Sequence, residues 1–333
     1  MSSFTTPVFI TPCQHLSIFS AVGADTRAFL QSQLTQDVSL ISPSQAAMAG
    51  FCTAQGRLWA TMLLTPTDQE QQIHGVIAAD LMESLLKRLR MFVLRSKVTL
   101  GPVPDLQVLG IEVAAADFDV LSSTLEVTLP GAIWQAQMTS CGTWIQVPSA
   151  NENCRLRLLA LTTARQAEQI VDQLGENGKV LTDVNAWKAQ DVQAGMAWVE
   201  ASTQDLFIAQ TLNLDLIGGV SFTKGCYPGQ EVIARAHYRG TVKRRMHVAT
   251  IVSPTEVEMK AGMDVFDASD PDNPVGRLIN VANTVTKTDE GPVTIWVLFE
   301  APFKSIETAS LRVGSSEGPL LTMQPMPYDI APT

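Results

Sequence analysis

The segment LNLDLIGGVSFTKGCYPGQEVIARAHYRGTVKRR, residues 212–245, is the most informative part of the chain. From Gly229 onward its pattern predicts a helix, with Pro228 at the first position, where the missing N–H costs nothing. Gly225 and Gly229 are expected to adopt backbone conformations that a β-carbon would forbid. Cys226 would therefore lie just before the first turn of a helix.

This position favours a reactive thiol at Cys226. The unpaired N–H groups and the dipole at a helix N-terminus favour negative charge, and Lys224 adds a positive charge two residues away. Both effects favour a thiolate over a thiol. The alternative is that Cys226 is a small buried residue in a tight bend, as many cysteines are. The residues alone leave both interpretations open.

The composition is that of a globular protein. The chain has 333 residues, of which 46% are hydrophobic and 17% charged, enough for two or three domains. Its N-terminus lacks a basic region followed by an apolar core, and no apolar run is long enough to span a membrane. The five cysteines, at positions 13, 52, 141, 154 and 226, include no CxxC pair. We expect a cytoplasmic protein with reduced thiols, no resident metal and no membrane contact.

Hydrophobic periodicity predicts mixed α+β structure up to about residue 240. Helices are predicted over residues 24–38, 80–92, 162–174 and 183–195. Strands are predicted in a hairpin over 49–66 that turns at 54–56, and at 71–79, 97–100, 106–113, 142–148 and 154–161. Asp80 and Glu83 have the spacing of a capping box, and Asp183 and Gly195 mark the ends of the last helix.

After residue 240 the pattern becomes all β. Short strands are predicted at residues 243–252, 263–268, 275–284, 293–300 and 310–314, separated by Gly, Pro and Asp turns. This spacing indicates a small antiparallel barrel or sandwich.

The run GGVSFTKGCYPGQE, residues 218–231, followed by ARAHYRGTVKRR, residues 234–245, resembles the motif of the YgfZ family of folate-binding proteins. The resemblance extends to GADTRAFLQSQLTQDV (23–38), AQGRLWATMLL (54–64) and MPY (326–328), and so covers most of the chain. It implies the three-domain fold of the glycine cleavage system aminomethyltransferase, arranged around a central channel that holds a folate.

The resemblance also implies a division into domains. Residues 1–240 would form a mixed α+β folate-binding region of two interleaved domains, about 1–100 with 180–240 and about 101–180. Residues 241–333 would form a C-terminal antiparallel β-barrel domain.

The same resemblance implies roles for particular residues. Cys226 would be the functional centre, as a thiolate nucleophile or transient ligand, with Lys224 as its electrostatic support. The turn around Cys226 would be shaped by Gly225, Tyr227, Gly229, Gln230 and Glu231. Trp187 matches a tryptophan that contacts folate in the family, although by pattern alone it is a core aromatic residue. A second family tryptophan falls near Leu16, so one stacking surface is missing or is replaced by Phe19.

A cationic stretch follows the motif. Residues 232–253 include no acidic residue and five cations, Arg235, Arg239, Lys243, Arg244 and Arg245, on a chain of net charge −10. Arg235 and Arg239 would share a helix face. They could bind the glutamate tail of a folate or RNA phosphate, or simply be solvated.

Three classes of function follow. The first is an accessory protein that binds tetrahydrofolate or a derivative and supports iron–sulfur enzymes, such as a tRNA methylthiotransferase, and thereby tRNA modification. The second is a folate-dependent one-carbon transferase with an unknown acceptor. Aminomethyl transfer is not expected, because Ala60 and Thr61 stand where the aminomethyltransferases carry aspartate. The third is a non-catalytic module that senses folate and docks a partner protein. Direct contact with tRNA is left open.

Overall fold

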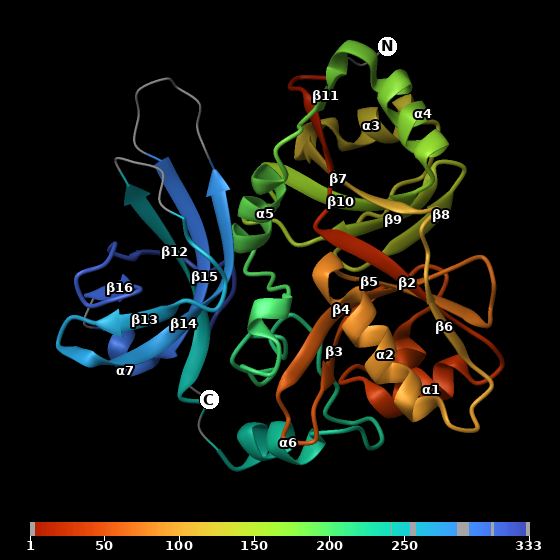
Figure 1. Cartoon of the computed structure of the whole chain (residues 1–333). Coiled ribbons are helices and arrows are strands. Elements are labelled where there is room, and N and C mark those ends of the chain that lie inside the picture. Colours follow the sequence, from red (N-terminus) through yellow and green to blue (C-terminus); the bar gives the residue numbers. More distant parts are fainter. Residues whose placement is uncertain (1–3, 241, 254–257, 285–292, 308–309, 331–333) are drawn as a thin grey trace.

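The computed structural model describes residues 4–240, 242–253, 258–284, 293–307 and 310–330. Within these residues the strands form three sheets (Figure 1). Two sheets lie in the first part of the chain, and the third, drawn in blue, is formed by the C-terminal part. The predicted α+β architecture is therefore confirmed, whereas the division into domains at residue 240 stays a prediction.

The first sheet has five antiparallel strands. Their order is β3 (Ala47–Cys52), β4 (Leu58–Pro66), β5 (Gln72–Ala78), β2 (Leu16–Val22) and β6 (Thr99–Pro102). Helices α1 (Thr26–Gln33) and α2 (Met82–Val93) pack on this sheet through buried residues such as Leu30 and Leu89.

The second sheet has six strands. Their order is β11 (Gly178–Val180), β1 (Val8–Pro12), β7 (Gln107–Ala114), β10 (Arg155–Thr162), β9 (Gly142–Val147) and β8 (Ala136–Thr139). Helices α3 (Phe118–Thr124) and α4 (Ala164–Leu174) share a core with one face, and Leu158 belongs to that core. The next residue, Leu159, points to the opposite core, which also contains Trp187 of α5 (Val184–Gln193).

The third sheet has six antiparallel strands and curls into a half-barrel. Their order is β16 (Leu311–Val313), β13 (Asp264–Asp267), β14 (Asp270–Thr284), β15 (Val293–Pro302), β12 (Arg244–Ser253) and β17 (Thr322–Gln324), and α7 (Phe303–Ile306) follows β15. Within the described residues the edge strands β16 and β17 do not pair with each other. A closed barrel therefore stays a prediction.

Several local predictions were wrong. The helix predicted over 24–38 ends at Gln33. Asp80 and Glu83 form no capping box, because a 3-10 turn (Ala79–Leu81) precedes α2 and the Asp80 carboxylate instead accepts the backbone N–H of Ala201 at 2.9 Å. Strands β1 and β2 were not predicted at all. Asp183, by contrast, caps α5 as predicted.

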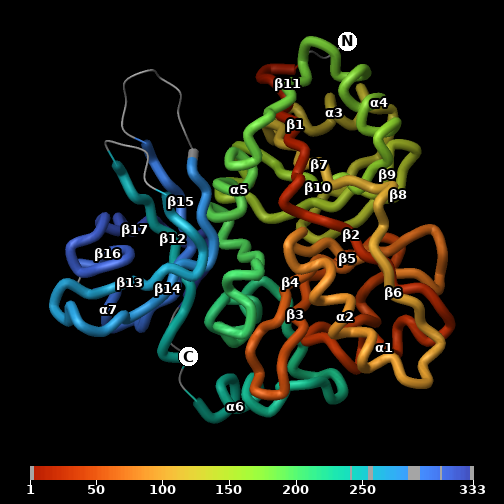
Figure 2. The backbone as a smooth tube through the Cα atoms, in the orientation of Figure 1, coloured from red at the N-terminus to blue at the C-terminus, as the bar shows by residue number. Residues whose placement is uncertain are grey.

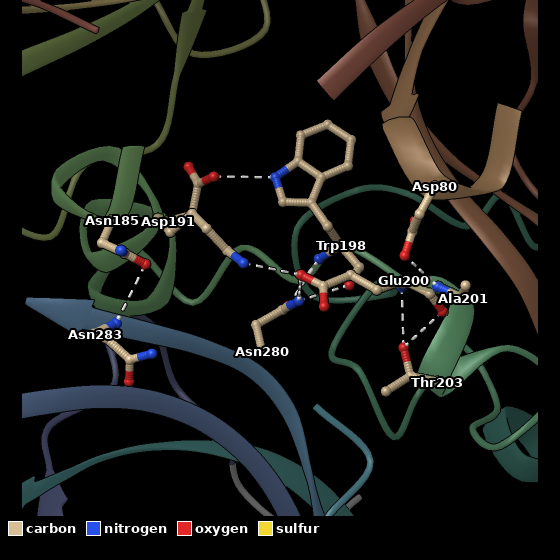
Figure 3. A network of polar contacts seen from close by, with 10 residues as sticks. Asp80, Asn185, Asp191, Trp198, Glu200, Ala201, Thr203, Asn280 and Asn283 are labelled. Atoms are coloured by element: carbon tan, nitrogen blue, oxygen red, sulfur yellow. Dashed lines mark hydrogen bonds and ion pairs between the residues drawn. The ribbon is translucent and has the colours of Figure 1, made fainter. Parts of the chain in front are cut away.

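Residues 196–203, the central segment, connect all three sheets. Figure 3 shows the contacts of Trp198 with Asp191 and Asn280 and of Ala201 with Asp80. The Val199 N–H donates to Thr61 of β4 at 2.9 Å. The Trp198 N–H donates to Asn280 of β14 at 3.0 Å, and its indole N–H donates to Asp191 of α5 at 3.1 Å. The Asp191 carboxylate in turn pairs with Arg157 of β10. The central segment belongs to none of the strands, yet it fixes the sheets against one another.

Candidate functional site

Cys226 lies in the loop before α6 (Gln230–Tyr238). Helix α6 lies at the lower end of the molecule in Figures 1 and 2. The side chain of Cys226 is exposed, as is that of Cys154, whereas Cys13, Cys52 and Cys141 are buried. Cys226 is therefore not a small residue that fills a tight bend, and a molecule in solution can reach its thiol.

Lys224 anchors this loop to the end of α1. Its ammonium donates to the carbonyl oxygens of Gln31, Leu34 and Gln36, at 2.5, 2.6 and 3.0 Å. The last carbonyls of a helix have no partner within the helix and lie at its negative end, so a buried cation is stabilised there. Burial lowers the pKa of Lys224 to about 8, against the opposing effect of Asp37, so the ammonium form predominates at neutral pH.

Tyr227 holds the other side of the Cys226 turn. It is buried, and the centre of its ring lies 5.2 Å from the Lys224 ammonium, within the range of a cation–π contact. Burial raises the pKa of Tyr227 well above its usual value, so its phenol stays neutral. Lys224 and Tyr227 thus fix the turn on which the thiol is presented. The predicted electrostatic support of Cys226 by Lys224 stays a prediction.

The β3–β4 turn packs directly against the start of α6. Gly229 has φ +81°, and a β-carbon there would lie 2.5 Å from the carbonyl oxygen of Thr53 and 2.6 Å from the Cα of Gly56. Gly56 also has positive φ, +75°. Gly225 differs, because its φ is not positive and a β-carbon would meet nothing within 4 Å. The prediction that the backbone requires glycine is thus confirmed at Gly229. The same prediction for Gly225 was wrong.

The remaining motif residues begin α6. Gln230 is its first residue, and its N–H donates to the carbonyl of Tyr227 at 3.2 Å. Glu231 is exposed in the first turn, where a negative charge suits the helix dipole. Pro228 lies two residues before the helix and not at its first position, because Gly229 in its left-handed conformation caps the helix.

Two cations of the predicted basic stretch are neutralised by ion pairs. Arg244 pairs with Glu300 across the β12–β15 ladder at 2.7 Å. Arg245 is buried and pairs with Asp215, also at 2.7 Å. Both arginines therefore stabilise the folded chain through ion pairs.

The other three cations are exposed. Arg235 lies on α6, Arg239 follows it with its N–H donating to the carbonyl of Arg235 at 3.0 Å, and Lys243 precedes β12. Among the described residues they form no ion pair. Next to them the rings of His237 and Phe222 stack at 3.7 Å between centres. A small cationic surface thus remains beside the Cys226 loop.

Trp187 lies on α5. Helix α5 lies between the second and third sheets and away from α6 (Figures 1 and 2). Trp187 is 2% exposed, and the guanidinium carbon of Arg157 lies 4.2 Å from the centre of its ring. Gly110 makes room for the ring, since a β-carbon there would come within 2.2 Å of it. The structure therefore does not bring Trp187 together with Arg235 and Arg239.

The space beside Trp187 is a cavity of about 200 Å³. Ligand pockets usually measure roughly 300–1,000 Å³, so this cavity suits one ring system and not a whole folate. The buried indole N–H of Trp187 has no acceptor among the described residues. The size of the cavity is compatible with the pterin end of a folate.

Neither residue near the second tryptophan position supplies a stacking surface. Leu16 is buried and lines a separate cavity of about 340 Å³. Phe19 is fully buried and fills the space over Gly75, where a β-carbon would come within 2.2 Å of its ring. Phe19 is a core residue and does not replace the tryptophan.

Ala60 and Thr61 occupy the two positions at which the aminomethyltransferases are expected to carry aspartate, and only Thr61 has a polar side chain. Its hydroxyl accepts the Val199 N–H at 2.9 Å and donates to the carbonyl of Ala197 at 3.2 Å. Thr61 and Ala60 are both fully buried. The Thr61 hydroxyl is therefore hydrogen-bonded to backbone groups, and neither Thr61 nor Ala60 can transfer a proton at neutral pH.

Comparison with known proteins identifies the family. No protein-family model matches the chain. Over 332 residues, 99% of this chain and 95% of the relative, it is 30% identical to the tRNA-modifying protein YgfZ of Photorhabdus laumondii subsp. laumondii. The chain belongs to the YgfZ family. It is also 27% identical over 326 residues to the tRNA-modifying protein YgfZ of Yersinia pseudotuberculosis, covering 98% of this chain and 94% of that protein.

A solved structure shows the fold that this YgfZ-family chain shares. The glycine cleavage system aminomethyltransferase T from Bartonella henselae superposes with a TM-score of 0.68 at 15% identity, over 97% of this chain and 86% of that one. The predicted family and its aminomethyltransferase-like fold are both confirmed. In the part of the chain that the structure describes, no helix has the length and apolar character needed to cross a membrane.

Proposed function

We propose that this YgfZ-family protein supports tRNA modification through the exposed thiol of Cys226. One contrast carries the proposal: Lys224 and Tyr227 are buried and Gly229 is packed against backbone, whereas the thiol between them is exposed. A fixed turn with an exposed thiol suits nucleophilic attack on a partner or transient binding to it.

The finer proposal concerns the partner and the cofactor. The partner would be an iron–sulfur enzyme such as a tRNA methylthiotransferase, and a reduced folate would place its pterin beside Trp187. The family resemblance supports both, and the cavity of about 200 Å³ beside Trp187 supports the folate alone. Three domains around a channel, closed by a C-terminal barrel, would be the setting. When bound, the folate would supply a one-carbon carrier; Trp187 would hold and orient its ring.

Aminomethyl transfer is not part of this proposal. Ala60 and Thr61 offer no carboxylate to an amine substrate, and the Thr61 hydroxyl is hydrogen-bonded to the central segment. Thr61→Asp would place a charge in a fully buried position and is expected to destabilise the protein without creating transferase activity.

The deciding experiment compares two exposed cysteines. A strain that lacks the gene is complemented with wild type, Cys226→Ser or Cys154→Ser, and methylthiolated tRNA is quantified by mass spectrometry. We expect Cys226→Ser to lose about 10-fold or more of the modification and Cys154→Ser to match wild type. Equal thermal stability and equal amounts of soluble protein are required for all three. Full activity of Cys226→Ser would overturn the proposed role.

Folate binding is tested separately by calorimetric titration of tetrahydrofolate into wild type and Trp187→Phe. The phenylalanine keeps a ring in the core but removes the N–H, and we expect binding to weaken by about 5-fold or more. Unchanged affinity would place the folate elsewhere and leave the role of Cys226 untouched.

A further inference from the structure

A second cationic stretch lies far from Cys226 in the sequence. Residues 84–104 include no acidic residue and five cations, Lys87, Arg88, Arg90, Arg95 and Lys97. They occupy the end of α2 and the loop that follows. Four of these five cations are exposed. The exception is Arg88, whose guanidinium carbon lies 5.0 Å from the centre of the Trp59 ring. On a chain of net charge −10, this stretch creates a local positive field.

Three exposed apolar side chains lie within this stretch. Met91 is 63% exposed, Phe92 37% and Leu94 87%. Single exposed apolar residues are ordinary, but three within four positions form a patch. We call Met91, Phe92, Leu94, Arg95 and Lys97 the 91–97 surface.

Leu94 adopts an unfavourable backbone conformation at this surface. Its φ is +42°, a region that leucine rarely occupies and in which strain persists only where the surroundings impose it. Three residues later, Asp25 fixes the loop, since its N–H donates to the Lys97 carbonyl at 3.2 Å and its carboxylate accepts the Lys97 N–H at 2.7 Å. Gly23 permits this close approach, because a β-carbon there would lie 2.1 Å from the Lys97 carbonyl oxygen. The loop is thus held with leucine in solvent.

We propose that the 91–97 surface docks an acidic segment of a partner protein. An apolar centre enriched in methionine and aromatic residues, with a charged rim, is the anatomy of a protein–protein interface. The cations of the rim complement an acidic partner and would steer its approach. The Asp25 carboxylate lines a depression together with Phe92, Leu94 and Arg95; it accepts the Lys97 N–H and offsets one of the surrounding positive charges.

Two other occupants fit less well. A membrane-binding helix presents a whole apolar face, whereas the apolar stripe of α2, formed by Leu85, Leu86 and Leu89, is buried in the core. RNA recognition relies on aromatic stacking, and Phe92 is the one aromatic residue of the 91–97 surface, its ring turned edge-on to that of Phe51 at 73°. The proposal is independent of Cys226 and of folate.

The test uses the full-length protein and a fluorescent helical peptide of about 18 residues, with leucines on one face and glutamates beside them. A peptide of the same composition with a scrambled face is the control. We expect Leu94→Gly to weaken binding about 10-fold while its melting temperature is unchanged or higher, since glycine suits φ +42°. Arg95→Glu combined with Lys97→Glu should weaken binding to a similar extent, and added salt should weaken wild type.

Control variants exclude general surface effects. Leu320→Ala changes an exposed leucine in the C-terminal part of the chain, and Arg165→Glu an exposed arginine of α4; both should bind the peptide as wild type does. Equal binding of the two peptides, or unchanged binding by Leu94→Gly, would overturn the proposal. Binding of bulk tRNA or phosphatidylglycerol vesicles that depends on Leu94 would also overturn it and assign the surface to that ligand.

Discussion

Gly56 and Gly229 lie backbone against backbone where the β3–β4 turn meets α6. A β-carbon on Gly229 would lie 2.6 Å from the Cα of Gly56, and one on Gly56 would lie 3.1 Å from the carbonyl oxygen of Gly229. The two glycine backbones are in direct contact, and the side chain of Val232 packs beside them, since a β-carbon on Gly56 would lie 2.7 Å from the Val232 Cβ. The position of the turn that carries Cys226 is therefore set by the hairpin 170 residues earlier in the chain.

Because of this contact, substitutions at two glycines of the motif, Gly229 and Gly225, should affect stability differently. Gly229→Ala is expected to cost about 2 kcal/mol or more of unfolding free energy, because alanine is strained at φ +81° and its methyl would clash. Gly225→Ala, at a position with open space around it, should change stability by less than about 0.5 kcal/mol. Urea denaturation of both variants measures the difference. Equal stabilities would contradict the packing described for Gly229.

Lys224 should contribute chiefly to stability. Lys224→Met removes the donor for the carbonyls of Gln31, Leu34 and Gln36, and we expect a loss of about 3 kcal/mol in urea denaturation. Lys243→Met, at an exposed position, is the matched control and should stay within about 0.5 kcal/mol of wild type. A Lys224→Met protein as stable as wild type would show that the three hydrogen bonds contribute nothing.

The thiols should divide into two groups by accessibility. In the native protein, iodoacetamide is expected to label Cys154 and Cys226 within minutes and to leave Cys13, Cys52 and Cys141 unlabelled until the protein is unfolded in urea. Burial raises the pKa of Cys52 to about 12 and that of Cys13 well above its usual value, which reduces their reactivity further. Peptide mass spectrometry gives the labelling at each site. Rapid native labelling of Cys52 would contradict the buried position of β3.

His247 should make the protein sensitive to acid. It is 4% exposed, its Nε2 has no partner among the described residues, and burial lowers its pKa from 6.5 to about 4. The unfolded chain therefore takes up a proton before the folded one does, so stability is complete above about pH 6.5 and falls as the pH approaches 4. Between pH 7.5 and 5, His247 alone should account for a loss of about 2 kcal/mol.

His247→Phe tests this prediction, because the neighbouring rings of Phe299 and Phe303 already form an aromatic environment. Across the same pH range, the variant should lose about 2 kcal/mol less than wild type in urea denaturation. Part of the decline should remain, since burial also lowers the pKa of His15 to about 3. Parallel pH profiles for the two proteins would show that His247 is not the titrating group.

Elements with local signals could be predicted from the sequence. Thr163 and Gln166 form a capping box at the start of α4, Asp183 caps α5, and Gly56 lies in the predicted hairpin turn. Each of these signals involves residues a few positions apart. Strand β2 was missed because its residues, buried at nearly every position, do not alternate between polar and apolar.

Features that depend on distant partners could not be predicted. Asp80 has the spacing of a cap, but its carboxylate binds a backbone N–H 121 residues away. Lys224 resembles a charge placed to assist a thiol, yet one of its acceptors is 190 residues away at the end of α1. The sequence pattern located the turn that precedes α6. The contacts of each residue in that turn depend on parts of the chain that only folding brings together.

The central segment has a consequence for how the protein unfolds. Through Val199 and Trp198 it binds β4, β14 and α5, and the ion pair of Asp191 with Arg157 extends these contacts to the second sheet. Loss of any one sheet would expose buried polar groups of the segment, so the sheets cannot melt one at a time without that cost. A chain of 333 residues should therefore unfold in a single calorimetric transition, as one cooperative unit.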